Sequence, residues 1–276
     1  MKQPFLFKEQ ERLGHYFNSA IPTSVTGCAP MVFIHGAAGG AWYWKQMMQY
    51  FAQRGYPCYA IDLHSRLCLA QPLSSRSIQE YVSRADDFIF RIVRAQHAHP
   101  PILVGHSMGG LIAPKLAVKN SFHRIILITP APPRGVRFLP GAASVSLRDA
   151  YRAVFAFATG GLYVPSRRLI ESTFVNPSAN KETIDMWARE HINESPRVLM
   201  DLFLSAVHIQ RGSIKSPMLI IGAGQDRVIH PAVGPKIAAF YESEFMLIPH
   251  LGHMCPFEYG WEETARRCET WLLTEQ

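Results

Sequence analysis

A serine between two glycines is the residue of this sequence best placed to do chemistry. Gly105-His-Ser107-Met-Gly109 matches the pattern G-x-S-x-G, follows the apolar run 102–105 and precedes a helical pattern. In that context the chain must turn sharply from strand to helix, and the serine hydroxyl is exposed at the carboxyl edge of a sheet. The glycines avoid collisions in the turn because they carry no side chain. The pentapeptide alone is a weak signal, but its flanking elements predict that Ser107 is a nucleophile.

A serine hydroxyl needs a base to take its proton, usually a histidine held by a carboxylate. Asp226 comes soon after the apolar run 218–222, and His253 lies in the loop after the run 244–248. Both leave their strands at the same edge of a parallel sheet as Ser107. The order Ser, Asp, His is also the one that accompanies this serine turn. We therefore expect Asp226 and His253 to complete a catalytic triad.

Other polar residues compete for these roles. His250 could be the base, although the preceding strand should barely have ended there, and Asp62 ends a strand-like run but precedes the serine. His106 is better interpreted as a packing histidine, and His230 as a cap of the helix that follows it. Histidine pairs could suggest metal ligands, but no third ligand is spaced to complete such a site. We expect neither a metal nor an organic cofactor.

A loop of small residues follows the first predicted core strand and reads His35-Gly-Ala37-Ala-Gly-Gly. Such a loop can fold close to the serine with its N–H groups exposed, and the residue after the nucleophile supplies a second N–H. The expected oxyanion hole is therefore formed by the N–H groups of Ala37 and Met108. A phosphate-binding loop is the competing interpretation, but no G-K-[ST] follows.

Short apolar runs alternate with helical patterns over most of the chain, which predicts an α/β fold with a mostly parallel sheet covered by helices on both faces. The expected strands are 31–35, 58–62, 102–105, 124–129, 218–222 and 244–248. The expected helices are 42–54, 77–96, 111–119 and 259–273. Ser77 and Glu80 have the spacing of a capping box at the start of the second helix.

The alternation breaks between residues 131 and 211, where helical patterns cover 146–158, 166–173, 180–191 and 195–209. We therefore expect a core of residues 1–130 and 212–276 with a helical cap inserted at 131–211. The many apolar residues of this cap either line a site for an apolar substrate or only attach the cap to the core.

Composition limits the class of protein and its partners. Of the 276 residues, 48% are hydrophobic and 18% charged, which favours a folded protein with a large core. The net charge is +7 with no run of five basic residues, so we expect no nucleic-acid partner, although an acidic carrier protein could dock. Five cysteines without C-x-x-C spacing favour a reducing, cytoplasmic location. The absence of an apolar stretch of about 18 residues predicts no stable membrane insertion.

Over nearly its whole length the chain resembles the α/β-hydrolase superfamily, through His-Gly-x-x-Gly, Gly-His-Ser-Met-Gly-Gly, Gly-x-x-Asp and Gly-His in the family order. The resemblance implies an eight-stranded sheet, here expected to lack early strands, and a helical cap after the sixth strand. It is closest to small esterases, thioesterases and lipase-like enzymes, and His-Gly-Ala-x-x-Gly-Ala-Trp also resembles the plant methylesterase and hydroxynitrile lyase branch. The loop beginning at Asp62 lacks the Asp-x-x-Gly-x-Gly turn of many relatives.

These observations predict a serine hydrolase that cleaves a carboxylic ester or thioester of a small, apolar substrate through an acyl-serine. The alternatives on the same fold are a carbon–carbon hydrolase, a lyase, a cofactor-free oxygenase or a hydrolase of carrier-protein esters. A third hypothesis is a binding protein with little or no activity. The presence of candidates for all three triad residues argues against it.

Overall fold

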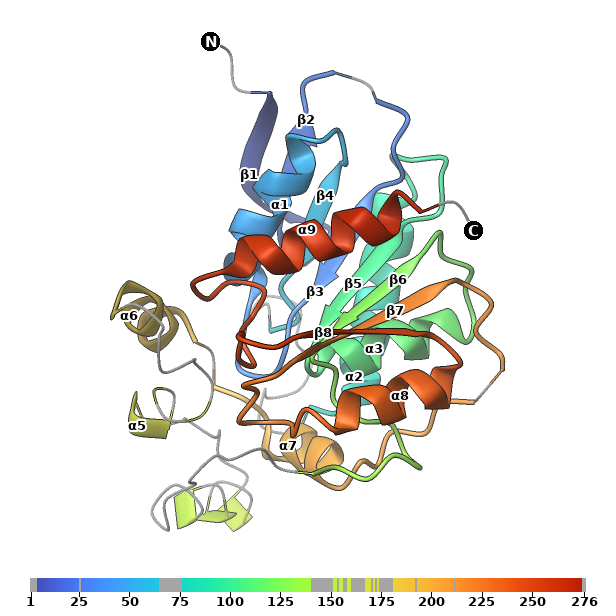
Figure 1. Cartoon of the computed structure of the whole chain (residues 1–276). Coiled ribbons are helices and arrows are strands. Elements are labelled where there is room, and N and C mark those ends of the chain that lie inside the picture. Colours follow the sequence, from blue (N-terminus) through green and yellow to red (C-terminus); the bar gives the residue numbers. More distant parts are fainter. Residues whose placement is uncertain are drawn as a thin grey trace.

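In the computed structural model of the chain, the described residues are 4–24, 26–64, 76–139, 181–191, 193–210 and 212–274, with scattered positions between 151 and 173. An eight-stranded sheet in the order β1-β2-β4-β3-β5-β6-β7-β8 runs through the molecule (Figure 1). Its strands are β1 (Phe5–Arg12), β2 (His15–Pro22), β3 (Met31–Ile34), β4 (Cys58–Ile61), β5 (Ile102–His106), β6 (Ile125–Ile128), β7 (Met218–Ala223) and β8 (Glu244–Ile248). The six strands from β3 to β8 pair in parallel, as the apolar runs predicted.

The central strands are short and apolar because both of their faces are buried. In β3, Val32 and Ile34 face one hydrophobic core, whereas Met31 and Phe33 face the other. This alternation follows from the two-residue repeat of a strand, whose successive side chains point to opposite faces. All four side chains are fully buried. The sheet is therefore the middle layer of three.

Helices form the two outer layers. One face carries α1 (Lys45–Ala52) and α9 (Trp261–Leu272), and the other carries α2 (Ile78–Phe88), α3 (Gly109–Ala117) and α8 (Val233–Tyr241) (Figure 1). A 3-10 turn, η1 (Ala41–Trp44), leads into α1, and a π-helical turn, η4 (Ile89–Val93), extends α2. The capping box at α2 is confirmed, since Ser77 and Glu80 bond each other's backbone N–H groups. Such a cap stabilises a helix by about 1 kcal/mol.

The expectation that early strands are missing is wrong. β1 and β2 form an antiparallel hairpin, and β2 pairs antiparallel with β4 at the edge of the sheet. Leu13 and Gly14 turn the chain between them, both with positive φ, 52° and 79°. β1 is mostly solvent-exposed and has the buried side chain of only Phe5, so it lacks the apolar run by which the other strands were found.

Between β6 and β7 the described residues contain helices and no extended strand. They include α5 (Arg167–Leu169), α6 (Lys181–Glu190) and α7 (Pro196–Phe203). The helices expected at 180–191 and 195–209 are thus found, the second ending earlier, and most of 146–158 lies outside the described residues. The division into a core and a 131–211 cap stays a prediction. Within the described part of the chain, no helix is both long and apolar enough to cross a membrane.

Candidate active site

Ser107 sits in a sharp turn between β5 and α3, and the turn requires glycine on both sides. Its φ is +52°, a left-handed conformation that is unfavourable for a residue with a side chain. A Cβ at Gly105 would lie 2.3 Å from the carbonyl oxygen of Gly109, and one at Gly109 would lie 2.1 Å from the carbonyl oxygen of Ile34. Only glycine therefore lets β5, the turn and β3 approach so closely.

The three residues of the expected triad are within hydrogen-bonding distance of one another. His253 Nε2 lies 3.0 Å from Ser107 Oγ, and His253 Nδ1 lies 2.8 Å from Asp226 Oδ2. The other oxygen of Asp226 accepts the N–H groups of Val228 and Ile229 at 2.8 and 2.9 Å. Asp226 and His253 are almost fully buried. The carboxylate is thus fixed by its own loop and oriented toward the imidazole, as the chain order predicted.

The competing residues lie elsewhere. His250 is exposed in the turn before His253, and Asp62 Oδ1 accepts the N–H of His64 at 2.8 Å. His230 Nδ1 accepts the N–H of Ala232 at 3.2 Å in the turn before α8, but the N-cap of that helix is Ala232 and no side chain caps it, so the expected capping role of His230 is wrong. Among the described residues, no group of three His, Cys, Asp or Glu side chains could hold a metal ion.

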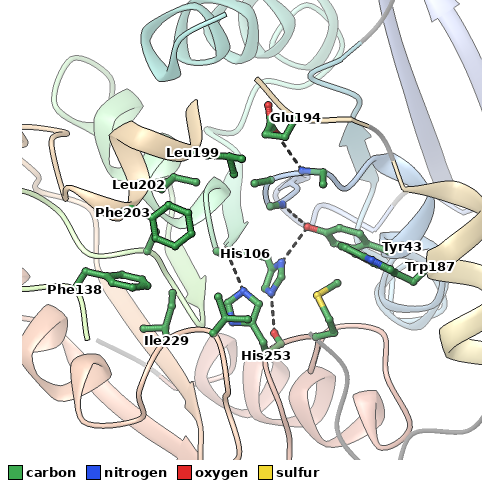
Figure 2. A pocket seen from close by; sticks show the side chains of 17 residues that line it. Tyr43, His106, Phe138, Trp187, Glu194, Leu199, Leu202, Phe203, Ile229 and His253 are labelled. Atoms are coloured by element: carbon green, nitrogen blue, oxygen red, sulfur yellow. Dashed lines mark hydrogen bonds between the residues drawn. The ribbon is translucent and has the colours of Figure 1, made fainter. Parts of the chain in front are cut away.

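His106 forms a hydrogen bond to the backbone of the triad histidine, His253. Its Nε2 donates to the carbonyl oxygen of His253 at 2.8 Å, and Thr129 Oγ1 donates to the same oxygen at 3.1 Å. Its Nδ1 lies 3.1 Å from the hydroxyl of Tyr43 (Figure 2). Burial lowers the pKa of His106 well below its usual value, which keeps the ring neutral with one donor and one acceptor nitrogen. His106 is thus a buried packing histidine, as expected, and its hydrogen bond also holds the backbone of His253.

The loop from Gly36 to Gly39 lies beside Ser107, where the oxyanion hole was expected. A Cβ at Gly36 would lie only 3.0 Å from Ser107 Cβ, which shows how close the loop comes. The hydroxyl of Tyr43 accepts the N–H of Gly36. Among the described residues, the N–H groups of Ala37 and Met108 donate to no protein acceptor. Both therefore have a donor free for a bound oxygen.

A largely apolar pocket opens over Ser107, bounded by residues of the core and of α6 and α7 (Figure 2). Its apolar lining includes Ala37, Ala38, Ala131, Phe138, Trp187, Leu199, Leu202, Phe203, Val228, Ile229 and Met254. Trp187, on α6, is fully buried and stacks on Phe257 with ring centroids 6.2 Å apart. Among the described residues, no lysine or arginine lines the pocket.

The pocket also contains a buried carboxylate that the sequence analysis missed. Glu194, between α6 and α7, is fully buried and lines the pocket together with Ala38 and Ser107. Burial raises its pKa, while hydrogen bonds from Ala38, Ser195 and Tyr81 oppose that shift. No local pattern distinguishes this glutamate from those on the solvent-exposed surface.

Comparison with known proteins agrees with this architecture. The model of the alpha/beta hydrolase family matches residues 31–267. Phospholipase YtpA of Bacillus subtilis is 24% identical over 211 residues, covering 73% of this chain and 77% of its own. Methylesterase 18 of Arabidopsis thaliana is 21% identical over 251 residues, covering 82% and 90%.

The fold is also shared with solved structures. A putative lipase from Acinetobacter baumannii superposes with a TM-score of 0.71 at 18% identity, covering 98% of this chain and 92% of that chain. Because the family model spans more than half of the sequence, including the serine turn and the loops of Asp226 and His253, the chain belongs to the alpha/beta hydrolase family.

Proposed function

We propose that the protein is a serine hydrolase that cleaves a carboxylic ester or thioester through an acyl-serine. The observation that carries the proposal is the continuous hydrogen-bonded path from Asp226 through His253 to Ser107. Relatives named as a phospholipase and a methylesterase, both acting on ester bonds, support the same reaction class.

In the proposed reaction, His253 Nε2 takes the proton of Ser107 as Oγ bonds to the substrate carbonyl carbon. The carbonyl π electrons move to its oxygen, which accepts the N–H groups of Ala37 and Met108. The tetrahedral intermediate then collapses, and the leaving alcohol or thiol takes the proton from His253. Water, deprotonated by His253, then attacks the acyl carbon. The second tetrahedral intermediate collapses as the bond to Ser107 Oγ breaks, His253 returns the proton to Oγ, and the acid is released. Asp226 orients the imidazole and stabilises its cation.

The pocket favours an uncharged, apolar acyl or alcohol group. Its described lining is mostly aliphatic and aromatic, and its charged groups are acidic or belong to the triad. A substrate carboxylate would lose its hydration there without a cation to replace it, which is unfavourable. We therefore propose short to medium uncharged esters as substrates.

The test is turnover of p-nitrophenyl butyrate by the wild type and by Ser107→Ala. We expect the variant to lose at least about 10³-fold in kcat, as triad variants do. Circular dichroism and thermal unfolding provide the control that the variant is folded. Turnover by purified, folded Ser107→Ala at the wild-type rate would exclude the proposal.

The alternatives on this fold, a carbon–carbon hydrolase, a lyase or a cofactor-free oxygenase, predict a different result. They predict that a fluorophosphonate still labels Ser107 while a broad panel of esters is not turned over. A protein that only binds its ligand predicts tight ligand retention with negligible turnover.

Because the net charge is +7, we also propose that an acidic carrier protein in the cytoplasm docks on the enzyme and presents the ester. Carrier-linked esters should then be cleaved faster than free ones, and salt should remove the advantage by screening. Equal rates on free and carrier-linked esters at low salt would exclude docking.

A further inference from the structure

A carboxylate from the segment between α6 and α7 reaches into the core beside the expected oxyanion hole. Glu194 is separated from its partners Ala38 and Tyr81 by 156 and 113 residues of sequence. The next residue, Ser195, is also fully buried, and its hydroxyl donates to the carbonyl oxygen of Arg76 at 2.7 Å. Residues 194 and 195 thus connect the pocket, which Glu194 lines, to the chain just before the first residue of α2.

Both oxygens of Glu194 accept hydrogen bonds from the protein. Oε2 accepts the N–H of Ala38 at 3.0 Å (Figure 2). Oε1 accepts the hydroxyl of Tyr81 at 2.9 Å and the N–H of Ser195 at 2.8 Å. Since the side chain is fully buried and its oxygens already have donors, Glu194 is built to hold protein groups rather than a substrate.

Two more side chains support the carboxylate. The hydroxyl of Tyr81 donates to Glu194, so it accepts from His64 Nδ1, which lies 3.1 Å away. His64 Nε2 lies 3.5 Å from Glu194 Oε2 but forms no hydrogen bond among the described residues, so His64 acts on the carboxylate through Tyr81. His64 stacks on His35, whose Nε2 accepts the N–H of Leu63 at 2.9 Å. The carboxylate is therefore held in one orientation by a fully buried polar cluster.

The contact with Ala38 matters because of where Ala38 lies. Its φ is +57°, a left-handed conformation that is unfavourable for an alanine. The peptide N–H that Glu194 fixes is the one directly after Ala37. Gly36 is fixed on the other side of Ala37 by its hydrogen bond to Tyr43. The residues on both sides of Ala37 are thus fixed, in a loop that lies beside Ser107 and in which the Ala37 N–H donates to no acceptor among the described residues.

We propose that Glu194 is a positioning residue that holds the Ala37 N–H in place for the oxyanion, and so makes the oxyanion hole depend on the segment between α6 and α7. The inference rests on the proposed ester hydrolysis and deepens it. Glu194 touches neither the reacting atoms nor the triad. It acts through Ala38, and its effect belongs to the transition state, where the carbonyl oxygen carries charge.

The test compares Glu194→Gln with Ser195→Ala. Glutamine keeps the size of the side chain but replaces one oxygen with an NH₂ group, which accepts no hydrogen bond. Its single oxygen can therefore accept either from Ala38 or from Tyr81 and Ser195, but not from both. We expect kcat on p-nitrophenyl butyrate to fall about 10- to 100-fold with KM within about twofold, a fraction of the loss seen when one oxyanion donor is removed. The rate of fluorophosphonate labelling of Ser107 should fall in parallel, because phosphonylation also develops charge on an oxygen held by this loop.

Ser195→Ala is the matched control. It removes the bond to the carbonyl of Arg76 and weakens the attachment of the same segment, but it leaves the contact between Glu194 and Ala38. We expect a lower unfolding temperature with kcat within about twofold. If both variants lose kcat equally, or if Glu194→Gln keeps the wild-type kcat and labelling rate, the proposal is overturned.

Two further measurements keep the result interpretable. If Glu194→Gln does not fold, Tyr81→Phe removes one donor to the carboxylate, and an unchanged kcat and labelling rate in that variant would overturn the proposal. Failure of the underlying function has a different signature, since a wild type without ester turnover, or an active Ser107→Ala, contradicts the hydrolase proposal. The labelling rates of wild type and Glu194→Gln still test the positioning role in that case.

Discussion

Replacing Gly109 with alanine tests the close packing that the serine turn needs. The new Cβ would lie 2.1 Å from the carbonyl oxygen of Ile34 and 2.9 Å from that of His35. Because these are backbone atoms at the end of β3, neither can rotate away. Real Cβ contacts are essentially never shorter than 3.0 Å, so the serine turn and β3 must separate by about 0.9 Å. That separation moves Ser107 away from the loop that follows His35.

A displacement of about 1 Å at a reacting group can lower the rate about 10²-fold, which corresponds to about 2.7 kcal/mol of transition-state stabilisation. We therefore expect Gly109→Ala to lower kcat/KM for a p-nitrophenyl ester about 100-fold, and to lower the free energy of unfolding by about 1–3 kcal/mol. Urea unfolding and steady-state kinetics measure the two effects separately.

Gly222→Ala is the matched control, since it makes the same substitution in β7. The atoms nearest to its Cβ would all belong to side chains, the ring of Phe245 at 3.1 Å and Leu247 Cδ1 at 3.5 Å, and a side chain can shift where backbone cannot. We expect kcat/KM within about twofold of the wild type. If Gly109→Ala also stays within about threefold and is equally stable, the close approach of the turn to β3 does not control the reaction.

Three other substitutions give distinct expectations. Asp226→Asn should lower kcat about 10⁴-fold with little change in KM, because the amide holds the imidazole of His253 in the wrong tautomer, and an active variant would contradict the triad. Tyr43→Phe removes the hydroxyl that accepts the N–H of Gly36, and we expect kcat to fall about 10-fold in steady-state assays, whereas wild-type kcat would show that the hydroxyl is not needed. Burial lowers the pKa of His64 to about 4 from 6.5, so the unfolded state binds the extra proton first and stability is lost as pH falls from 6.5 to 4. Between pH 8 and pH 5, the free energy of unfolding measured with urea should therefore fall by about 2 kcal/mol less in His64→Asn than in the wild type. An identical fall in both proteins would contradict a neutral buried His64. Burial raises the pKa of Glu194, so its contribution to the free energy of unfolding has the opposite sign and is lost as the pH rises.

The sequence was informative where structure and chemistry leave a local pattern. Buried parallel strands must be apolar on both faces, so β3 to β8 stood out as short apolar runs. Ser107 was found because its turn demands glycine at 105 and 109, and the loops holding Asp226 and His253 follow apolar runs that end at the same edge of the sheet.

The features that were missed leave no such pattern. β1 lies at the edge of the sheet and buries few of its side chains, so apolar and polar residues do not alternate clearly along it. Glu194 is buried only because the chain returns to Ala38 and Tyr81 from more than 100 residues away, and its own neighbourhood resembles a polar helix end.

Covalent labelling of Ser107 is the measurement that tests the central claim most directly. Intact-mass spectrometry and peptide mapping after treatment with a fluorophosphonate should find one adduct, on Ser107, formed at the same rate as ester turnover is lost. Ser107→Ala should remain unlabelled. Complete loss of turnover without an adduct on Ser107, or full turnover by a stoichiometrically labelled protein, would contradict the account.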